Sequence, residues 1–311
     1  MWQSAPHVSY ISAAAAPCLP LRRRLFSLGR MRKLLIMILV LAGAGEVAKA
    51  DEADAHYRAG ISFKKEGKLD EAIQEFEQAI VKRPDYAAAE YSLGVAYKMR
   101  NELTQAATHL EKAAKLQPKS AETHTSLGVT YHKLNKIDDA IRELEQAVEL
   151  NPADAVAQSS LGVLYRQKKD FAKAVPHLEK ALELDPKDAN AMANLGVALR
   201  QTNKMDEAEK YIRKALELKP DQAEFHFSLA VIYRRQQKVK EAIAEYEKAT
   251  ELSPTLAEAH YDLGTLYAQD KRNDEAVAEF NRYLELTATK DRKESDIVRQ
   301  HIKDLGGKPS R

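Results

Sequence analysis

The side chains of this sequence that could do acid–base chemistry or hold a metal ion are histidines and carboxylates. Four histidines share one place in a repeating unit of the chain: His56, His124, His226 and His260. Only His226 and His260 fall in neighbouring units. Packed helices lie about 8–10 Å apart, whereas zinc needs several ligands about 2 Å from one ion. We therefore predict that these histidines pack between helices and that the chain has no metal site.

Motifs of common catalytic sites are absent from the sequence. It has no His-Glu-x-x-His helix, no Gly-x-Ser-x-Gly turn and no glycine-rich phosphate loop, and its one cysteine is Cys18. His109 and His177 are expected to face outward from helices, where they complete no site. The many carboxylates alternate with lysines, as on solvated helix faces. We predict a protein with no catalytic residues, no cofactor and no enzymatic activity.

The elements that position these side chains recur at a constant interval. Seven units of equal length run from Ala53 without insertion or deletion: 53–86, 87–120, 121–154, 155–188, 189–222, 223–256 and 257–290. The eighth residue of each unit is small: Gly60, Gly94, Gly128, Gly162, Gly196, Ala230 and Gly264. The first six units close with proline: Pro84, Pro118, Pro152, Pro186, Pro220 and Pro254. Apolar residues three or four apart predict two helices per unit, packed closely at the small residue and ended by the proline.

These residues and the length of the unit resemble the tetratricopeptide repeat family. The resemblance covers residues 53 to about 288 of the chain. It implies an all-α fold: a right-handed α-solenoid of seven helix–turn–helix repeats whose first helices line a concave groove. After the last repeat, residues 291–305 place Ile297, Val298, Ile302 and Leu305 on one stripe. This stripe predicts a helix that caps the array within residues 291–311.

Three rows of side chains are expected along that groove. One place after the small residue stand Ile61, Val95, Val129, Val163, Val197, Val231 and Thr265, and four places after it stand Lys64, Lys98, His132, Arg166, Arg200, Arg234 and Ala268. A third row is Ser92, Ser126, Ser160, Asn194 and Ser228, and the aromatic anchors are Tyr91, Phe227 and Tyr261. An extended segment would place apolar side chains on the valines, carboxylates on the arginines and its backbone on the serines. The alternative interpretation is a solvated basic rim above partly buried valines.

The groove predicts a protein or peptide partner and a scaffold function, as an adaptor or assembly factor of the cell envelope. Family members that clamp chaperone tails have lysine three places before the small residue and asparagine one place after it. No unit here has that pair, which argues against such a clamp. Two other functions stay open: self-assembly through the terminal repeats, and a regulatory subunit of an envelope glycosyltransferase or secretion complex. A monomer at every concentration would exclude self-assembly.

The first 50 residues have the pattern of a secretory signal peptide. Arg32 and Lys33 precede an apolar stretch of 12 residues, 34–45, and Ala48 and Ala50 supply the small residues read before cleavage at Asp51. As a helix this stretch spans only about 18 Å of the about 30 Å that a bilayer requires. We expect an exported, periplasmic protein whose true start is Met31. An inner-membrane anchor through residues 34–45 and an extracellular location are the alternatives.

The distribution of charge argues against a nucleic-acid partner. The net charge is +2, but the first 50 residues hold seven basic residues and one acidic residue. The remaining chain therefore has 41 basic and 45 acidic residues, a net charge of −4. A mildly acidic body has no electrostatic reason to grip phosphate backbones. Membrane contact is expected only through a partner or an uncleaved N-terminal segment.

Overall fold

The computed structural model describes residues 37, 49, 51–287 and 292–310, and this part of the chain is helical, with turns and loops but no strand. Residues 51–65 form the first helix. Then follow α2 (Leu69–Lys82), α3 (Ala87–Met99), α4 (Leu103–Leu116), α5 (Ala121–Lys133), α6 (Ile137–Leu150), α7 (Ala155–Gln167), α8 (Phe171–Leu184), α9 (Ala189–Gln201), α10 (Met205–Leu218), α11 (Ala223–Arg235), α12 (Val239–Leu252), α13 (Ala257–Gln269), α14 (Asn273–Thr287) and α15 (Arg292–Asp304). Apart from Met37 and Lys49, the predicted signal peptide lies outside the described residues.

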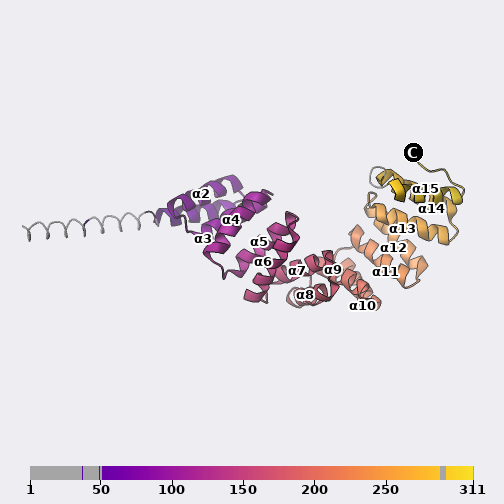
Figure 1. Cartoon of the computed structure of the whole chain (residues 1–311), viewed down its shortest axis with the longest axis horizontal. Helices are drawn as coiled ribbons and strands as arrows, with labels where there is room; N and C mark the ends of the chain where they lie inside the picture. The colour runs from indigo at the N-terminus through magenta and orange to yellow at the C-terminus, as the bar shows by residue number, and fades with distance from the viewer. Residues whose placement is uncertain (1–36, 38–48, 50, 288–291, 311) are drawn as a thin grey trace, which may run out of the picture.

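The helices pair as hairpins, and successive hairpins stack into an open arc that runs from α2 to α15 (Figure 1). Each hairpin packs against its sequence neighbours, and α3, α5, α7 and α9 also contact the first helix of the next hairpin. No second helix in the described chain contacts the next second helix to a similar extent. First helices that approach one another must line the inner side of the arc. The predicted all-α solenoid is therefore confirmed.

Each hairpin turns at one residue in the left-handed conformation. In four hairpins this residue is glycine or asparagine, the types that adopt the conformation most readily: Gly67, Asn101, Asn135 and Asn203, with φ angles of 78°, 63°, 59° and 63°. Lys169, Gln237 and Lys271 adopt it too, with φ angles of 60°, 61° and 63°. That conformation costs a residue with a Cβ roughly 1–2 kcal/mol, so helix packing, and not residue type, fixes the turn in those three repeats.

The small residue of each hairpin is required by a close approach of its two helices. A Cβ added to Gly128 would lie 2.6 Å from Leu144 Cγ and 3.1 Å from the carbonyl oxygen of Ala140. Leu144 and Ala140 are fully buried. The sixth hairpin has Ala230 at this place, and its own second helix has Tyr246 where the other hairpins have an aliphatic residue or phenylalanine. The small residue and its large neighbour thus form one packing unit.

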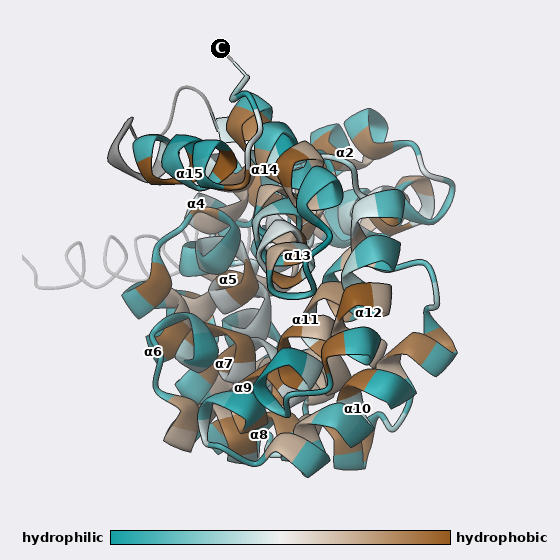
Figure 2. Cartoon of the chain, turned by 90° about the vertical axis from the view of Figure 1, so that its right-hand side faces the viewer, coloured by the Kyte–Doolittle hydropathy of each residue, from teal (hydrophilic) through white to brown (hydrophobic). Residues whose placement is uncertain are grey.

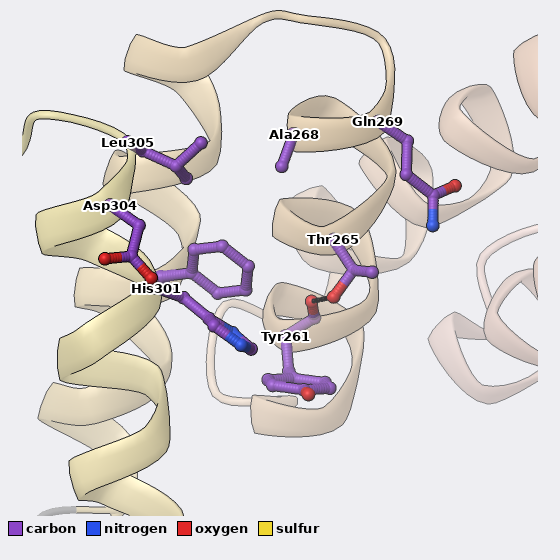
Figure 3. Close-up of a pocket in the computed structure, with 8 residues that line it drawn as sticks. Tyr261, Thr265, Ala268, Gln269, His301, Asp304 and Leu305 are labelled. Carbon is purple, nitrogen blue, oxygen red and sulfur yellow. Dashed lines mark hydrogen bonds between the residues drawn. The ribbon is translucent and has the colours of Figure 1, made fainter.

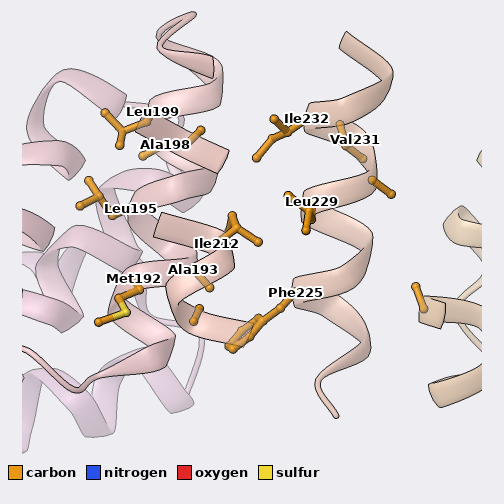
Figure 4. Packing of buried hydrophobic residues seen from close by; sticks show 14 of the residues in the cluster. Met192, Ala193, Leu195, Ala198, Leu199, Ile212, Phe225, Leu229, Val231 and Ile232 are labelled. Atoms are coloured by element: carbon orange, nitrogen blue, oxygen red, sulfur yellow. The ribbon is translucent and has the colours of Figure 1, made fainter. Parts of the chain in front are cut away.

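The core is a continuous seam along the arc and not a single centre. Each helix buries one stripe and exposes the rest, so most helices show both hydrophobic and hydrophilic segments (Figure 2). Leu195 of α9, Ile212 of α10, and Leu229 and Ile232 of α11, for example, are all buried in one cluster (Figure 4). Every hairpin therefore depends on its neighbours for stability.

The predicted capping helix is α15, which packs against α14. Val298 and Ile302 are fully buried, and Leu305 is half-buried just beyond the helix. Ile297, which the sequence placed on the same stripe, is 56% exposed, so that assignment was wrong. A helix turns about 100° per residue, and the stripe that starts at Val298 leaves Ile297 at its edge. No helix of the described residues is long and apolar enough to span a membrane.

Candidate binding groove

The inner face of the arc has the apolar floor that the sequence predicted from its valine row. Val95, Val129, Val163 and Val197 are half-buried on α3, α5, α7 and α9. Val231 on α11 is only 5% exposed, so the floor is sealed there. Half-burial leaves part of each of the first four side chains in contact with solvent. Those four residues can bury further apolar area when a ligand covers them.

Three pockets open on this face, at α5, α9 and α13. The pocket at α5 has a volume of about 420 Å³, and Lys98, Glu122, Ser126 and Val129 line it together with Asp154 and Val156. The pocket at α9 measures about 290 Å³ and is lined by Arg166, Asn190, Asn194, Val197, Glu224 and Ser228. The pocket at α13 measures about 350 Å³ and is lined by Tyr261, Thr265, Ala268, Phe280, His301 and Leu305 (Figure 3).

The residues of the basic row differ in their surroundings. The two at its centre, Arg166 and Arg200, form no ion pair with the described residues. Arg166 and Arg200 are half-buried, and no acidic side chain of the described residues lies within ion-pair distance of either. Their Nε atoms are buried and have no hydrogen-bond partner among the described residues. Burial lowers the pKa of both guanidinium groups, yet an arginine stays charged in proteins. Both are partly desolvated cations with no acidic side chain in direct contact, although the more distant Asp262 acts on Arg200, and this favours an incoming carboxylate.

Arg234, predicted to belong to the same row, is already neutralised. Its guanidinium donates to Asp262 Oδ1 at 2.7 Å, and the hydroxyl of Tyr246 donates to Asp262 Oδ2 at 2.9 Å. The side chain of Tyr246 is fully buried, and that burial raises its pKa far above the usual range. Arg234 is therefore held by α13 and is not free for a ligand.

At the other end of the row, Lys98 and His132 are half-buried, and the pKa of each is lowered. Burial and the nearby Lys133 lower the pKa of Lys98, and burial lowers the pKa of His132. The amide of Gln167 lies 3.2 Å from Nε2 of His132, an arrangement that fits a neutral imidazole accepting a hydrogen bond. Arg166 and Arg200 are therefore the residues of this row whose positive charge does not depend on pH and that have no acidic side chain within ion-pair distance among the described residues.

The serine row does not offer the free hydrogen-bonding edge that the sequence predicted. Ser92 and Ser126 are buried, with 2% and 8% exposed. Ser228 Oγ donates to the carbonyl of Glu224 at 2.7 Å, and Asn194 Nδ2 donates to the carbonyl of Asn190 at 2.8 Å, both within their own helices. Serine hydroxyls often bond back to the preceding turn in this way. Half-buried Ser160 and the amide oxygen of Asn194 remain as ligand contacts.

The three aromatic residues of the groove are half-buried, and their surroundings differ. Tyr91 donates to Glu122 Oε1 at 2.7 Å, and burial raises its pKa to about 12. Phe227 packs edge-on against Tyr246 with the ring centres 5.7 Å apart. Tyr261 lies 5.9 Å from Phe280, ring centre to ring centre, and lines the pocket at α13. Only Tyr261 combines an apolar surface with an open space beside it.

The four histidines of the shared place each pair with a carboxylate on the second helix of their own hairpin. The Nδ1 atoms of His56, His124, His226 and His260 lie 2.6, 2.8, 2.6 and 2.5 Å from Glu75, Glu143, Glu245 and Glu279. In the third, sixth and seventh hairpins the Nε2 atom also faces the carbonyl oxygen of the proline just before the helix, Pro118, Pro220 or Pro254. In these places the histidines join the two helices and the loop before them. The described residues contain no group of three or more potential ligands suited to a metal ion.

The prediction that His109 and His177 face outward was wrong. His109 Nδ1 lies 2.6 Å from the carboxylate of Glu90, and His177 Nδ1 lies 2.8 Å from the amide oxygen of Gln158. Both rings stack on a tyrosine of their own hairpin. His109 and His177 stand at the position of the second helix that glutamate occupies in the first, third, sixth and seventh hairpins. The signal in the sequence was this constant spacing, across which histidine and its partner exchange places between repeats.

Family comparisons agree with this architecture. Residues 30–262 match the family described as "Cilia and flagella-associated protein 70 C-terminal domain", and residues 233–292 match the family "Tetratricopeptide repeat". The first match spans more than half of the chain, and neither description names a catalytic activity. No curated protein matches the sequence significantly.

Several solved structures have a similar fold, and nearly the whole length of each one aligns with this chain. The TPR protein YrrB, described as having an unusual peptide-binding site, is 22% identical, with a TM-score of 0.53, over 63% of this chain and 97% of its own. A tetratricopeptide repeat protein from Parabacteroides merdae is 18% identical, with a TM-score of 0.57, over 83% and 100%. MamA is 27% identical, with a TM-score of 0.50, over 56% and 95%. At these identities YrrB and the Parabacteroides protein show the fold alone.

Proposed function

Because this chain belongs to the tetratricopeptide repeat family, we propose that it is a non-enzymatic scaffold whose groove binds an extended polypeptide. The observation that supports this most is the pair of half-buried, unpartnered arginines, Arg166 and Arg200, beside half-buried valines. A cation removed from water without an anion is costly, and a ligand carboxylate would recover that cost. That YrrB, a protein of the same fold, has a peptide-binding site makes a peptide ligand a natural choice.

The proposed ligand is an extended segment with at least one acidic side chain. Its carboxylate pairs with Arg166 or Arg200, and its apolar side chains cover Val163 and Val197. A guanidinium can bind a carboxylate through two parallel hydrogen bonds, which fixes the position of the segment along the groove. Arg234 contributes less, since Asp262 already binds it.

A matched charge reversal tests this proposal. Arg166→Glu with Arg200→Glu changes the net charge as much as Lys210→Glu with Lys240→Glu, two exposed lysines on α10 and α12. Both double variants are used as bait for proteins from cells that make the chain, after thermal melts show that they fold. The groove variant should lose the partners that the wild type captures, and the lysine variant should keep them. Equal capture by all three proteins would refute the proposal.

We also propose that the chain is exported and works as an adaptor or assembly factor in the cell envelope. The support is the basic run, the apolar stretch 34–45 and the small residues at Ala48 and Ala50. An exported location would put the groove in contact with envelope proteins. Cell fractionation followed by N-terminal sequencing tests this, with Asp51 expected as the first residue of the mature protein.

A further inference from the structure

The first two groove pockets recur at equivalent places, two repeats apart. Lys98, Glu122, Ser126 and Val129 at the first pocket occupy the same repeat places as Arg166, Asn190, Asn194 and Val197 at the second. Another two repeats along, Tyr261 and Thr265 of the third pocket hold the places of Ala193 and Val197, but this pocket lies between α13 and α15 and has no lining residue from α11. Equivalent residues of a regular solenoid lie in line along its axis. One ligand can therefore contact all three pockets in sequence.

The second pocket has the chemistry of a carboxylate site. Two polar residues of the first pocket, Glu122 and Thr125, are replaced here by Asn190 and Ala193, so one carboxylate is lost. Arg166 has no acidic partner among the described residues, and its Nε atom is buried without a hydrogen bond. Glu224 also lines this pocket, but it is exposed and forms no ion pair with Arg166. The first pocket, by contrast, contains the carboxylates of Glu122 and Asp154 and does not select an anion.

The third pocket has the chemistry of an apolar site. Ala268 stands here at the repeat place that Arg200 holds two repeats earlier, and Thr265 at the place of Val197. The hydroxyl of Thr265 donates to the carbonyl of Tyr261 at 2.9 Å. Tyr261, Phe280 and Leu305 supply the walls (Figure 3). The space exists because α15 packs against α14 through Val298 and Ile302, leaving room between α15 and the inner face of α13.

The geometry points to a single extended ligand segment held at two subsites: a carboxylate side chain beside Arg166 and a large apolar side chain between α13 and α15. This inference rests on the proposed function and gives its ligand a pattern. Arg166 lies on α7, three repeats before α13, which corresponds to roughly 24–30 Å along the groove at about 8–10 Å per packed helix. An extended chain rises about 3.3 Å per residue, so the two ligand residues stand about seven to nine positions apart.

Synthetic peptides test this pattern directly. Short fluorescein-labelled peptides of serine, threonine and alanine, all of one length, carry one glutamate and one phenylalanine, separated by three, seven, eight, nine or thirteen positions and in both orders. Their affinity for the full-length protein is measured by fluorescence anisotropy. In one of the two orders, separations of seven to nine should bind about tenfold more tightly than three or thirteen, the gain expected when two weak contacts are made at once.

Single variants assign each ligand residue to its pocket. On the wild type, replacing the peptide glutamate with glutamine, or its phenylalanine with alanine, should each weaken binding about tenfold. Arg166→Gln should remove only the preference for glutamate, and Ala268→Phe, which fills the third pocket, only the preference for phenylalanine. Lys210→Gln serves as the control and should change neither.

The outcomes separate this inference from the proposed function. Affinity that is independent of spacing, but still abolished by Arg166→Glu with Arg200→Glu, contradicts the two subsites and leaves the groove as the binding face. A lack of binding by every peptide, together with unchanged partner capture by that double variant, contradicts both. Peptide binding could also weaken as the protein concentration rises, with a matching increase in mass by light scattering. That result would mean that a second copy of the protein occupies the groove, and it would overturn the inference.

Discussion

Glu90 and His109 form the same bridge as the other histidine–glutamate pairs of the array, with the two residues exchanged. His109 Nδ1 lies 2.6 Å from Glu90 Oε2, and Glu90 is only 2% exposed. A buried carboxylate that loses its partner costs roughly 1–3 kcal/mol. His109→Ala should therefore destabilise the protein by about that much, because only the longer contact to Lys112, at 3.5 Å, would remain. Urea unfolding of the variant and the wild type measures the difference.

The exchange itself provides the control for this pair. Glu90→His and His109→Glu should each destabilise the protein, whereas the double variant restores the order found in the first, third, sixth and seventh repeats. Urea unfolding should show that the double variant recovers most of the stability lost by the single ones. A double variant no more stable than the sum of the single losses would show that the pair does not act as a unit.

A methyl group at Gly128 should disrupt the contact between α5 and α6. The added Cβ would lie 2.6 Å from Leu144 Cγ, and the Ala140 backbone on the other side cannot move easily. Gly128→Ala should cost about 1–3 kcal/mol by overpacking, measured by urea unfolding. Combining it with Leu144→Ala should cost less than the sum of the two single changes. Full additivity would mean that the close approach is not the reason for glycine here.

Two arginines of one row should respond oppositely to the same substitution. Arg234→Gln leaves the largely buried carboxylate of Asp262, also bound by Tyr246, without its cation, and should lower stability by roughly 1–3 kcal/mol. Arg166→Gln removes a desolvated charge that has no acidic partner among the described residues and should leave the melting temperature unchanged or higher. Equal melting temperatures of the two variants would contradict the distinction between Arg234, which is paired with Asp262, and Arg166, which has no such ion pair.

His177 should make the protein less stable as the pH falls below neutrality. Burial lowers its pKa in the folded state from the usual value of 6.5. Above pH 6.5 the imidazole is neutral in both states and the contribution of His177 is complete. As the pH falls through 6.5, the unfolded chain binds a proton before the folded chain does, and that stability is lost. Thermal melts on either side of this range should show a larger decrease on acidification for wild type than for His177→Gln. A larger decrease in melting temperature for His177→Gln than for the wild type would contradict this prediction.

Much of the fold could be predicted from the sequence because the same residue types recur at the same helix contacts in every repeat. Seven copies of the small residue, with six of the closing proline, specify hairpins and their stacking, and the helices start and stop accordingly. The same logic failed for Lys169 and Lys271, which adopt left-handed turns with no local signal. There the packing of neighbouring helices overrides the local preference of the residue.

The candidate site was less predictable, because side-chain partners depend on differences between repeats. The arginine row is regular in sequence, yet Asp262 binds Arg234 and no acidic side chain of the described chain binds Arg166. Ser228 follows the serine row, but its hydrogen bond returns to its own helix. The pocket at α13 depends on where α15 settles, which a periodic pattern does not specify.

Site-specific photo-crosslinking tests the central claim most directly, that one extended polypeptide lies along the first helices. Benzoylphenylalanine is placed at Val129 or Val197 on the inner face, or at Lys210 or Lys240 on second helices, in cells that make the full chain. The two inner positions should crosslink to the same partner, and the two second-helix positions should not. Crosslinks to a partner from Lys210 and Lys240, with none from the valines, would contradict the account.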